Sequence, residues 1–490
     1  MLRFQKYALV LVLNLVFSLL AQGADFGPDF EDYIRNVMDK YKTPGVAVAV
    51  IGKDGVLYKQ GFGYRDIEKK LPVTPRTLFA IGSTTKAFTA AATGILVDEG
   101  KVSFNRPVKQ YMPTFALHDP VATERATLRD LLGHTTGLPR HDLMWYGSNW
   151  TRQELFDRLR FLQPSAAFGE KFQYNNLMFM TAGMLIQTLS GSTWEEFIKS
   201  RIFGPLGMSS STLSTEESQK SDDFSLPYAD AGPAGIVAMP FRDLTAIAPA
   251  GSINSNLEDM SRWVRLHLNQ GRWNGKTLIS ETSITEAYKP HILTRKAGAP
   301  FPEFSDSYYG MAWGILDFRG HRMLSHDGGI DGFVANVSFM PDEGYGVVVL
   351  LNNTSISAQA LAFHIWDRIL NVAPSDWIER FKDTPSQPNP DPVFTPSDRP
   401  LDDFVGVYEN PAYGKVTITA GHDQAPGADL IVVFNVITAP LRHTQNLEFS
   451  IPGVPQEAIR KISFGQNDNG KIVKLRWKLE ASADPIEFTR

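Results

Sequence analysis

Ser83 and Lys86 have the residue types and the spacing of a nucleophile and its base. Both belong to Ser83-Thr84-Thr85-Lys86, which leads into a run that predicts a helix, Ala87 to Asp98. A serine at a helix N-terminus lies near unpaired backbone N–H groups, and a lysine three residues on lies over the same face. A buried lysine can lose its proton near neutral pH and activate the serine. Taken alone, the pair also fits a helix cap followed by a solvated lysine.

Tyr174 and Asn176 form a second candidate pair, in a loop before the predicted helix Met178 to Leu189. A phenol with a lowered pKa beside a lysine can share proton transfer with it. An amide such as Asn176 can hydrogen-bond the lysine or a substrate carbonyl. A further Tyr-x-Asn begins at Tyr408, but it lies in the C-terminal part of the chain, far from the other candidates in the sequence.

His326-Asp327-Gly328-Gly329 is the third candidate element, at the end of the strand-like run Arg322 to Ser325. Gly328 and Gly329 allow a substrate to approach the backbone, so the strand edge can donate an N–H group to a developing oxyanion. His326 can polarise or bind the substrate. A histidine beside two glycines is also typical of a simple turn, so this element indicates chemistry only together with the other two.

The three elements, in the order Ser-x-x-Lys, Tyr-x-Asn and His-x-Gly, resemble those of the serine β-lactamase and penicillin-binding-protein-like hydrolases, in particular the class C β-lactamase and esterase branch. The resemblance covers Phe30 to about Leu370. Further matching runs are Leu131 to Pro139, Pro249 to Ser252, Tyr309 to Gly314 and Gly328 to Phe333. It implies a mixed α/β, transpeptidase-like fold, with an antiparallel sheet, a helical subdomain and the active site between them.

The resemblance also implies a role for each candidate. Ser83 looks like the acylated nucleophile, Lys86 like its proton acceptor and Tyr174 like the residue that relays protons. Asn176 is similar to the amide that holds the substrate. The backbone N–H groups of Ser83 and Gly329 match the oxyanion hole.

His326 is the main departure from the family pattern, because it takes the place of the lysine in Lys-Thr-Gly. A permanent cation there suits the carboxylate of β-lactams, whereas histidine, with a reference pKa near 6.5, is mostly neutral at pH 7. We therefore expect an esterase or peptidase, with a charge preference that changes as His326 titrates. Asp327 replaces the usual Thr or Ser; it either attracts a basic substrate group or, the interpretation we favour, hydrogen-bonds a turn.

Composition excludes several classes of protein. The 490 residues are 43% hydrophobic and 21% charged, as in an ordinary globular protein. The net charge of −5 comes without a long run of like charges, so nucleic acid is not an expected partner. The absence of cysteine excludes thiol nucleophiles and Cys-based metal sites. The histidines are scattered, and we expect neither a metal nor another cofactor.

Hydrophobic patterns place strands at both ends of the main domain and helices between them. The predicted elements are a helix over Phe30–Tyr41, a hairpin of Val46–Ile51 and Val56–Gly61, helices over Leu155–Leu162 and Trp194–Ile202, and strands over Trp313–Phe318, His321–Ser325, Phe333–Met340 and Gly344–Leu351. Strands at both ends indicate one sheet that is closed by the two ends of the domain. A capping-box pattern, Ser192 to Glu195, opens the helix at Trp194.

Four segments are predicted along the chain. Residues 1–23 resemble a signal peptide, since two cations precede the apolar run Tyr7 to Leu20, which is short for the ~20 residues of a membrane span. A β-lactamase-like catalytic domain occupies 24–382, and a proline-rich linker over 383–400 separates it from a lipocalin-like all-β module over 401–490. No membrane span is expected after signal cleavage.

The sequence thus predicts a secreted serine hydrolase that cleaves a small ester, amide or lactam, or a peptide, through an acyl-Ser83 intermediate. The competing hypothesis is an extracellular structural or matrix protein, for example of a biomineral, that keeps the fold with little turnover. The chain is somewhat similar to secreted mollusc shell-matrix members of the family, which favours an association with extracellular matrix. Four glycosylation sequons are compatible with a eukaryotic secretory route; they begin at Asn149, Asn336, Asn352 and Asn353.

Overall fold

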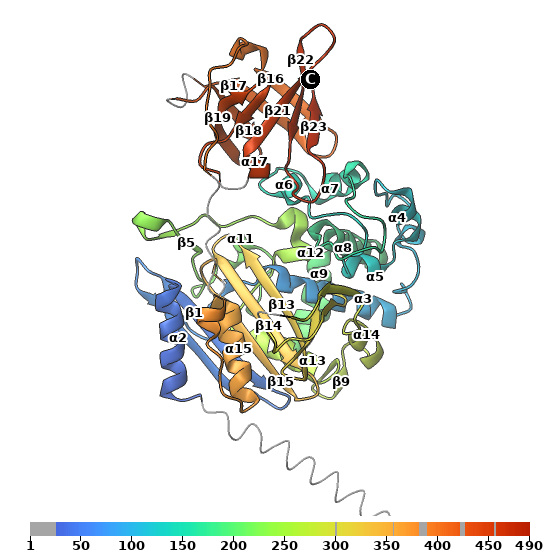
Figure 1. Ribbon diagram of the computed structural model, residues 1–490. Helices are drawn as coiled ribbons and strands as arrows, with labels where there is room; N and C mark the ends of the chain where they lie inside the picture. Colours follow the sequence, from blue (N-terminus) through green and yellow to red (C-terminus); the bar gives the residue numbers. More distant parts are fainter. Residues whose placement is uncertain (1–25, 299–300, 356, 382–389, 422–426, 455–456) are drawn as a thin grey trace, which may run out of the picture. The chain divides into compact units, whose positions relative to one another are not determined.

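The computed structural model describes residues 26–298, 301–355, 357–381, 390–421, 427–454 and 457–490 (Figure 1). The predicted signal peptide and residues 383–389 of the predicted linker lie outside these ranges. Contacts divide the chain into two compact units, Met1–Phe104 with Ala182–Asp383, and Asn105–Thr181 with Thr384–Arg490. The predicted domain boundaries stay a prediction, but Asn105–Thr181, inside the predicted catalytic domain, groups with the C-terminal module.

An antiparallel sheet forms the centre of the first unit, and in the described residues it has nine strands in the order β10-β11-β12-β13-β14-β15-β1-β2-β3. Strand β1 pairs with β15 on one side and β2 on the other, which confirms that the two ends of the domain close one sheet. The strands are β1 Gly45–Gly52, β2 Val56–Asp66, β3 Leu71–Pro72, β10 Ile292–Arg295, β11 Ser307–Tyr309, β12 Gly314–Phe318, β13 His321–Ile330, β14 Phe333–Met340 and β15 Tyr345–Leu351.

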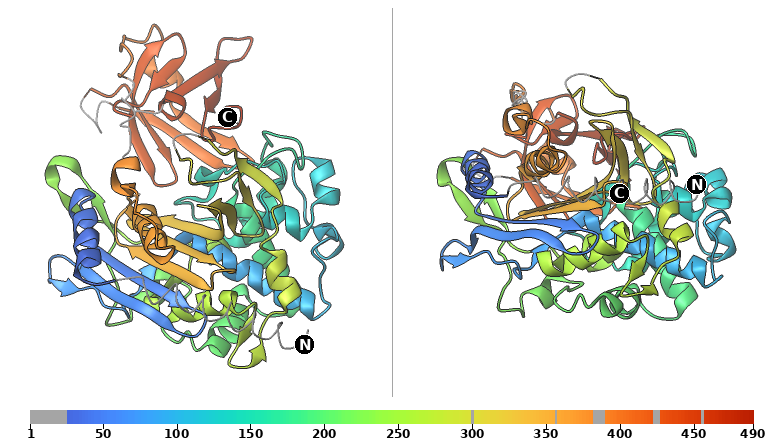
Figure 2. Two further views of the ribbon diagram at one scale, coloured as in Figure 1. Left: turned by 60° about the horizontal axis from the view of Figure 1, so that its bottom comes forward. Right: turned by 90° about the horizontal axis from the view of Figure 1, so that it is seen from below.

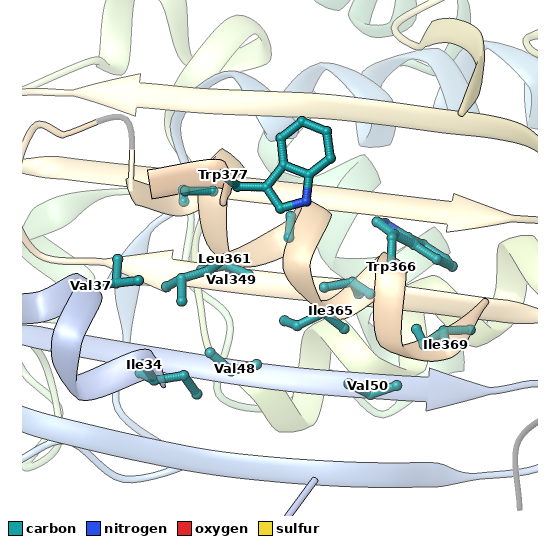
Figure 3. Packing of buried hydrophobic residues seen from close by; sticks show 14 of the residues in the cluster. Ile34, Val37, Val48, Val50, Val349, Leu361, Ile365, Trp366, Ile369 and Trp377 are labelled. Atoms are coloured by element: carbon teal, nitrogen blue, oxygen red, sulfur yellow. The ribbon is translucent and has the colours of Figure 1, made fainter. Parts of the chain in front are cut away.

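Helices cover both faces of this sheet, so β1 is buried along its whole length. Alternate β1 residues such as Val48 and Val50 face α2 (Pro28–Lys40) and α15 (Ser357–Ile369), and Figure 3 shows their packing. The opposite face contacts α13 (Leu257–Leu268). Figure 2 shows α2 and α15, in blue and orange, on one face and green helices on the other. Each fully buried valine contributes roughly 1.5–3 kcal/mol of hydrophobic stabilisation.

Helix α3 (Thr85–Asp98) is buried from Thr85 to Leu96, and it confirms the helix predicted after Lys86. The remaining helices and short strands of the first unit are β4 Phe79–Ala80, η2 Gly82–Thr84, α9 Trp194–Ile198, η5 Lys199–Phe203, α10 Gly204–Leu206, α11 Thr215–Ser218, β5 Tyr228–Asp230, η6 Gly232–Ala234, β6 Ile236–Ala238, η7 Thr245–Ile247, α12 Ala248–Gly251, β7 Asn254–Ser255, β8 Arg272–Trp273, β9 Lys276–Thr277, α14 Glu281–Glu286 and α16 Trp377–Arg380. The capping box of α9 lies one residue later than predicted, between Thr193 and Glu196.

The second unit combines short helices with a closed β-barrel, which has eight strands in the described residues and confirms the predicted C-terminal all-β module. Its helices are η3 Val108–Gln110, α4 Pro120–Arg125, α5 Leu128–Leu132, α6 Asp142–Trp145, α7 Arg152–Arg158, η4 Leu159–Phe161, η8 Leu401–Asp403 and α17 Glu457–Arg460. Its strands are β16 Gly406–Asn410, β17 Gly414–Ala420, β18 Leu430–Phe434, β19 Ile437–Gln445, β20 Glu448–Ser450, β21 Lys461–Gln466, β22 Ile472–Trp477 and β23 Ile486–Thr489. Helix α8 (Asn176–Ser190) begins in this unit.

Three of the four sequon asparagines are buried. Asn336, Asn352 and Asn353 are 5%, 0% and 4% exposed, whereas Asn149 is exposed. A glycan on the folded chain therefore fits only at Asn149. No helix in the described ranges has the length and apolar character of a membrane span.

Histidine burial predicts acid sensitivity of the first unit. Burial lowers the pKa of His267, whose Nδ1 lies 2.5 Å from Tyr288 Oη, to about 3. The unfolded chain binds this proton below about pH 6.5 and the folded chain does not, so stability is full above pH 6.5 and falls as the pH approaches 3. Between pH 7 and pH 5 we expect a loss of about 2 kcal/mol from this residue.

The variant His267→Gln keeps a hydrogen-bonding partner for Tyr288 but does not titrate. Calorimetric Tm values at pH 7 and pH 5 should differ less in this variant than in the wild type. Equal pH dependence in both proteins would contradict the assignment.

Candidate active site

Ser83 lies in a tight turn that joins a short strand to helix α3. Strand β4 pairs with β7, Ile81 N donates to Ile253 O at 3.0 Å, and the turn η2 then carries Ser83. Gly82 adopts φ +50°, a left-handed conformation that favours glycine. The helix begins at Thr85, so Ser83 is fixed immediately before the first turn of α3.

Lys86 contacts Ser83 directly. Its Nζ donates to Ser83 Oγ at 3.0 Å and to the backbone oxygen of Ala250, on α12, at 2.8 Å. Lys86 is 0% exposed, whereas Ser83 is half-buried. The hydroxyl can therefore meet a substrate while the amine behind it is shielded from water, which is the contact that the sequence spacing predicts.

Gly328, on β13, allows this turn to lie against the sheet. A Cβ atom at Gly328 would come within 1.9 Å of Ile81 O, and one at Gly82 within 2.8 Å of Gly329 N. Only hydrogen fits at these positions. The contact places the amide of Gly329 beside the turn that carries the amide of Ser83.

The register of β13 explains where Gly329 points. Ile330 pairs with Phe333 across a two-residue turn, so these two residues exchange both backbone hydrogen bonds. Since the bonding direction alternates along a strand, the N–H of Gly329 points away from β14. On the other side of β13, strand β12 pairs only as far as Ser325, through its first residue, Gly314. Gly329 therefore has no β12 residue opposite it. The predicted pair of oxyanion-hole donors, Ser83 and Gly329, thus lies at one open strand edge.

His326 lies within β13 rather than after it, and it is 8% exposed. Its Nδ1 donates to the backbone oxygen of Asp327 at 2.6 Å, so its Nε2 accepts from Tyr309 Oη at 2.8 Å. Burial, and then the charge of Lys86, lowers the pKa of His326 to about 3. The expectation that His326 titrates near neutral pH is wrong, because the imidazole stays neutral throughout that range.

Asp327 is exposed and lies on the face opposite to His326. Its Oδ1 accepts from Nδ2 of Asn336, the residue opposite it on β14, at 2.7 Å. Asp327 is therefore hydrogen-bonded as expected, but to the neighbouring strand rather than within a turn.

Tyr174 and Asn176 belong to the second unit, where they lie at the start of α8. Tyr174 is half-buried, and Asn176 is 6% exposed. Asn176 Nδ2 donates to Asp142 Oδ1 at 2.9 Å, and the Arg140 guanidinium lies 4.8 Å from the centre of the Tyr174 ring. His134 orders the same loop, since its Nδ1 accepts from Asn175 N at 3.0 Å.

Several partners of the candidate residues were not predicted. The carbonyl of Ala250 and the hydroxyl of Tyr309 lie in runs that resemble the family, yet that resemblance alone indicates no role for them. Arg140 and Asp142 stand directly after the run that ends at Pro139 and carried no signal of their own. Within the described ranges, no cluster of three or more His, Asp or Glu side chains could hold a metal ion.

Comparison with known proteins gives two domain matches. Residues 30–367 match the Beta-lactamase family, and residues 390–490 match a domain of unknown function, DUF3471. The chain is 31% identical over 431 residues to "Unguisins hydrolase ungD'" of Aspergillus campestris, covering 81% of this chain and 78% of that protein. It is 25% identical over 350 residues to "Protein flp" of Staphylococcus aureus, covering 71% and 67%.

A solved structure extends the comparison to the whole fold. The octameric penicillin-binding protein homologue from Pyrococcus abyssi superposes with a TM-score of 0.64 at 25% identity, covering 94% of this chain and 99% of that one. This likeness spans both the sheet-based unit and the C-terminal barrel. The family match, the relatives and the fold together show that the chain belongs to the Beta-lactamase family.

Proposed function

We propose that the chain is a serine hydrolase that cleaves a small ester, amide or lactam through an acyl-Ser83 intermediate. The observation that carries the proposal is the 3.0 Å hydrogen bond between Ser83 Oγ and the fully buried amine of Lys86. An amine in this position, when neutral, accepts the hydroxyl proton as the oxygen attacks. The relatives named as unguisins hydrolases support hydrolysis as the reaction class.

The chemistry follows from the contacts of these groups. Ser83 Oγ bonds to the carbonyl carbon while its proton passes to Lys86 Nζ. The carbonyl oxygen becomes negative, and the N–H groups of Ser83 and Gly329 stabilise it. The bond to the leaving group then breaks, and the leaving group takes up the proton, with Tyr174 as its proposed relay. Water finally attacks the acyl carbon and regenerates the Ser83 hydroxyl.

Neutral His326 supports esters or amides, including peptides, as the substrate class. The family position that would carry a fixed cation holds an uncharged imidazole, whose two nitrogens contact Tyr309 and the Asp327 carbonyl. An anionic lactam gains no ion pair from it.

We further propose that the chain is exported, as the cationic and apolar pattern of residues 1–23 indicates. Covalent labelling of the active-site serine separates an enzyme from the alternative, a matrix protein with little turnover. A dead site would not react with an acylating probe.

Ser83 is expected to be the residue that a fluorophosphonate or fluorescent penicillin labels. Ser83→Ala should abolish labelling without unfolding the chain, because Ser83 is half-buried in a turn rather than in the core. Ser214→Ala is the control, since Ser214 also stands just before a helix, α11, but lacks a lysine one turn on. Mass spectrometry of the labelled peptide checks the site. A label on another serine, or none on folded wild type, would refute the proposal.

Gly328→Ala should slow acylation about 100-fold, because its Cβ would collide with Ile81 O and displace the turn that carries Ser83. Gly329→Ala is its neighbour control, since a Cβ there meets no atom within 4 Å and the backbone N–H remains. We expect less than about threefold loss for it. The measurement is the second-order acylation rate constant; similar losses in both variants would contradict the close contact.

The preference for neutral over anionic substrates should not change between pH 5 and pH 8, because His326 has a pKa of about 3. The measurement is the ratio of acylation rates for a neutral short-chain ester and an anionic penicillin. The pH dependence of groups that act in both reactions cancels in this ratio. His326→Lys introduces a cation and should raise relative acylation by the penicillin about fivefold. A wild-type ratio that changes with a midpoint near pH 6.5 would contradict the buried neutral imidazole.

A further inference from the structure

The loop Pro139 to Asp142 contacts both candidate residues of the second unit. Asp142 Oδ1 accepts from Asn176 Nδ2 at 2.9 Å, and Arg140 places its guanidinium 4.8 Å from the Tyr174 ring centre. A cation over an aromatic face attracts the ring electrostatically. The two side chains at which this family pattern would hold substrate and relay protons are therefore both touched by one short loop.

Asp142 is itself held in place from several directions. Its Oδ1 also accepts from Trp145 Nε1 at 2.9 Å, and its Oδ2 accepts from Arg140 Nε at 2.6 Å. An amide nitrogen carries two N–H donors in one plane. A fixed acceptor for one of them sets the orientation of the other, so Asp142 determines how Asn176 presents its amide.

His141, between these two residues, points to the C-terminal barrel. It is 0% exposed and adopts φ +49°, which non-glycine residues seldom do. Its backbone N–H donates to Glu480 Oε2 at 2.8 Å. Its Nε2 donates to the Gln163 carbonyl at 2.9 Å, so its Nδ1 accepts from Tyr413 Oη at 2.7 Å. Every polar atom of the imidazole thus has a defined partner.

Glu480 and Tyr413 are barrel residues that are buried at this contact, 7% and 1% exposed. Glu480 is fixed in turn, since its Oε1 accepts from Ser482 N at 2.9 Å. Burial lowers the pKa of His141 and raises that of Tyr413, so both stay uncharged near neutral pH. A second contact lies nearby, where Asn435 Nδ2 donates to Leu143 O at 3.0 Å.

We propose that the C-terminal barrel takes part in catalysis by holding the loop Pro139 to Asp142, with Glu480 and Asp142 as positioning residues for Asn176 and Tyr174. The inference rests on the proposed function and assigns a role to the DUF3471 region. Two consecutive residues link the barrel to the candidate residues: His141 hydrogen-bonds to Glu480 and Tyr413, and Asp142 hydrogen-bonds to Asn176. Loss of the barrel contact releases the unusual backbone of His141 and, with it, the carboxylate of Asp142.

Acylation kinetics of full-length variants test this role. Glu480→Ala and Asp142→Ala should each lower the rate constant for Ser83 labelling at least about tenfold. Glu480→Gln and Asp142→Asn keep an oxygen acceptor, and we expect them to restore the rate to within about threefold of wild type. His443→Ala is the control, because His443 is a buried barrel residue that bonds to Thr395 and Asn446 rather than to the loop. It should lower Tm without slowing labelling.

Hydrogen exchange gives a readout that does not need activity. Glu480→Ala should increase exchange in peptides covering residues 138–146 and 173–178, and His443→Ala should leave them protected. Unchanged exchange in 173–178 together with a wild-type labelling rate in both alanine variants would overturn the positioning role. If His443→Ala slowed labelling equally, the slowing in the other variants would come from a general loss of stability, and the positioning role would be rejected. Absence of labelling in wild type would refute the hydrolase proposal alone, and the exchange result would still decide whether the barrel holds the loop.

Discussion

The burial of the Lys86 amine against Ser83 is the constraint on which the first unit depends. Removing a charged or strongly polar group from water costs several kcal/mol unless fixed partners replace the solvent. Ser83 Oγ and the carbonyl of Ala250 are such partners of Lys86. The small residues of α3, such as Ala87 and Ala91, and the pairing of β4 with β7 keep these partners close while excluding water.

Local parts of this site could be predicted from the sequence because they depend on neighbouring residues. The contact between Ser83 and Lys86 follows from helical spacing, and both ends of strand β14 were predicted correctly from its apolar run. The His326 environment could not be predicted in the same way. Its neutral state depends on burial and on the charge of Lys86, and only the folded chain produces this environment.

The grouping of Asn105–Thr181 with the barrel was also beyond the sequence patterns. His141 and Tyr413 are separated by most of the chain, and neither carries a local signal that indicates the other. The proline-rich run predicts a linker, but its composition does not indicate the contacts that the C-terminal module makes. Long-range polar contacts between single residues have no periodicity, so sequence patterns do not report them.

The place of β1 in the sheet has a consequence for how the chain folds. Val46 pairs with Leu351, about 300 residues later, so β1, an interior strand of the sheet, lacks one neighbour until most of the first unit has been synthesised. At roughly 5–20 residues per second, this takes tens of seconds on the ribosome. Helix α3 can form early, but Gly328 and Gly329 reach it only when β13 arrives. The chain thus emerges with Ser83 and its N–H group early, whereas the N–H of Gly329, the other proposed oxyanion donor, joins them only after β13 has been synthesised.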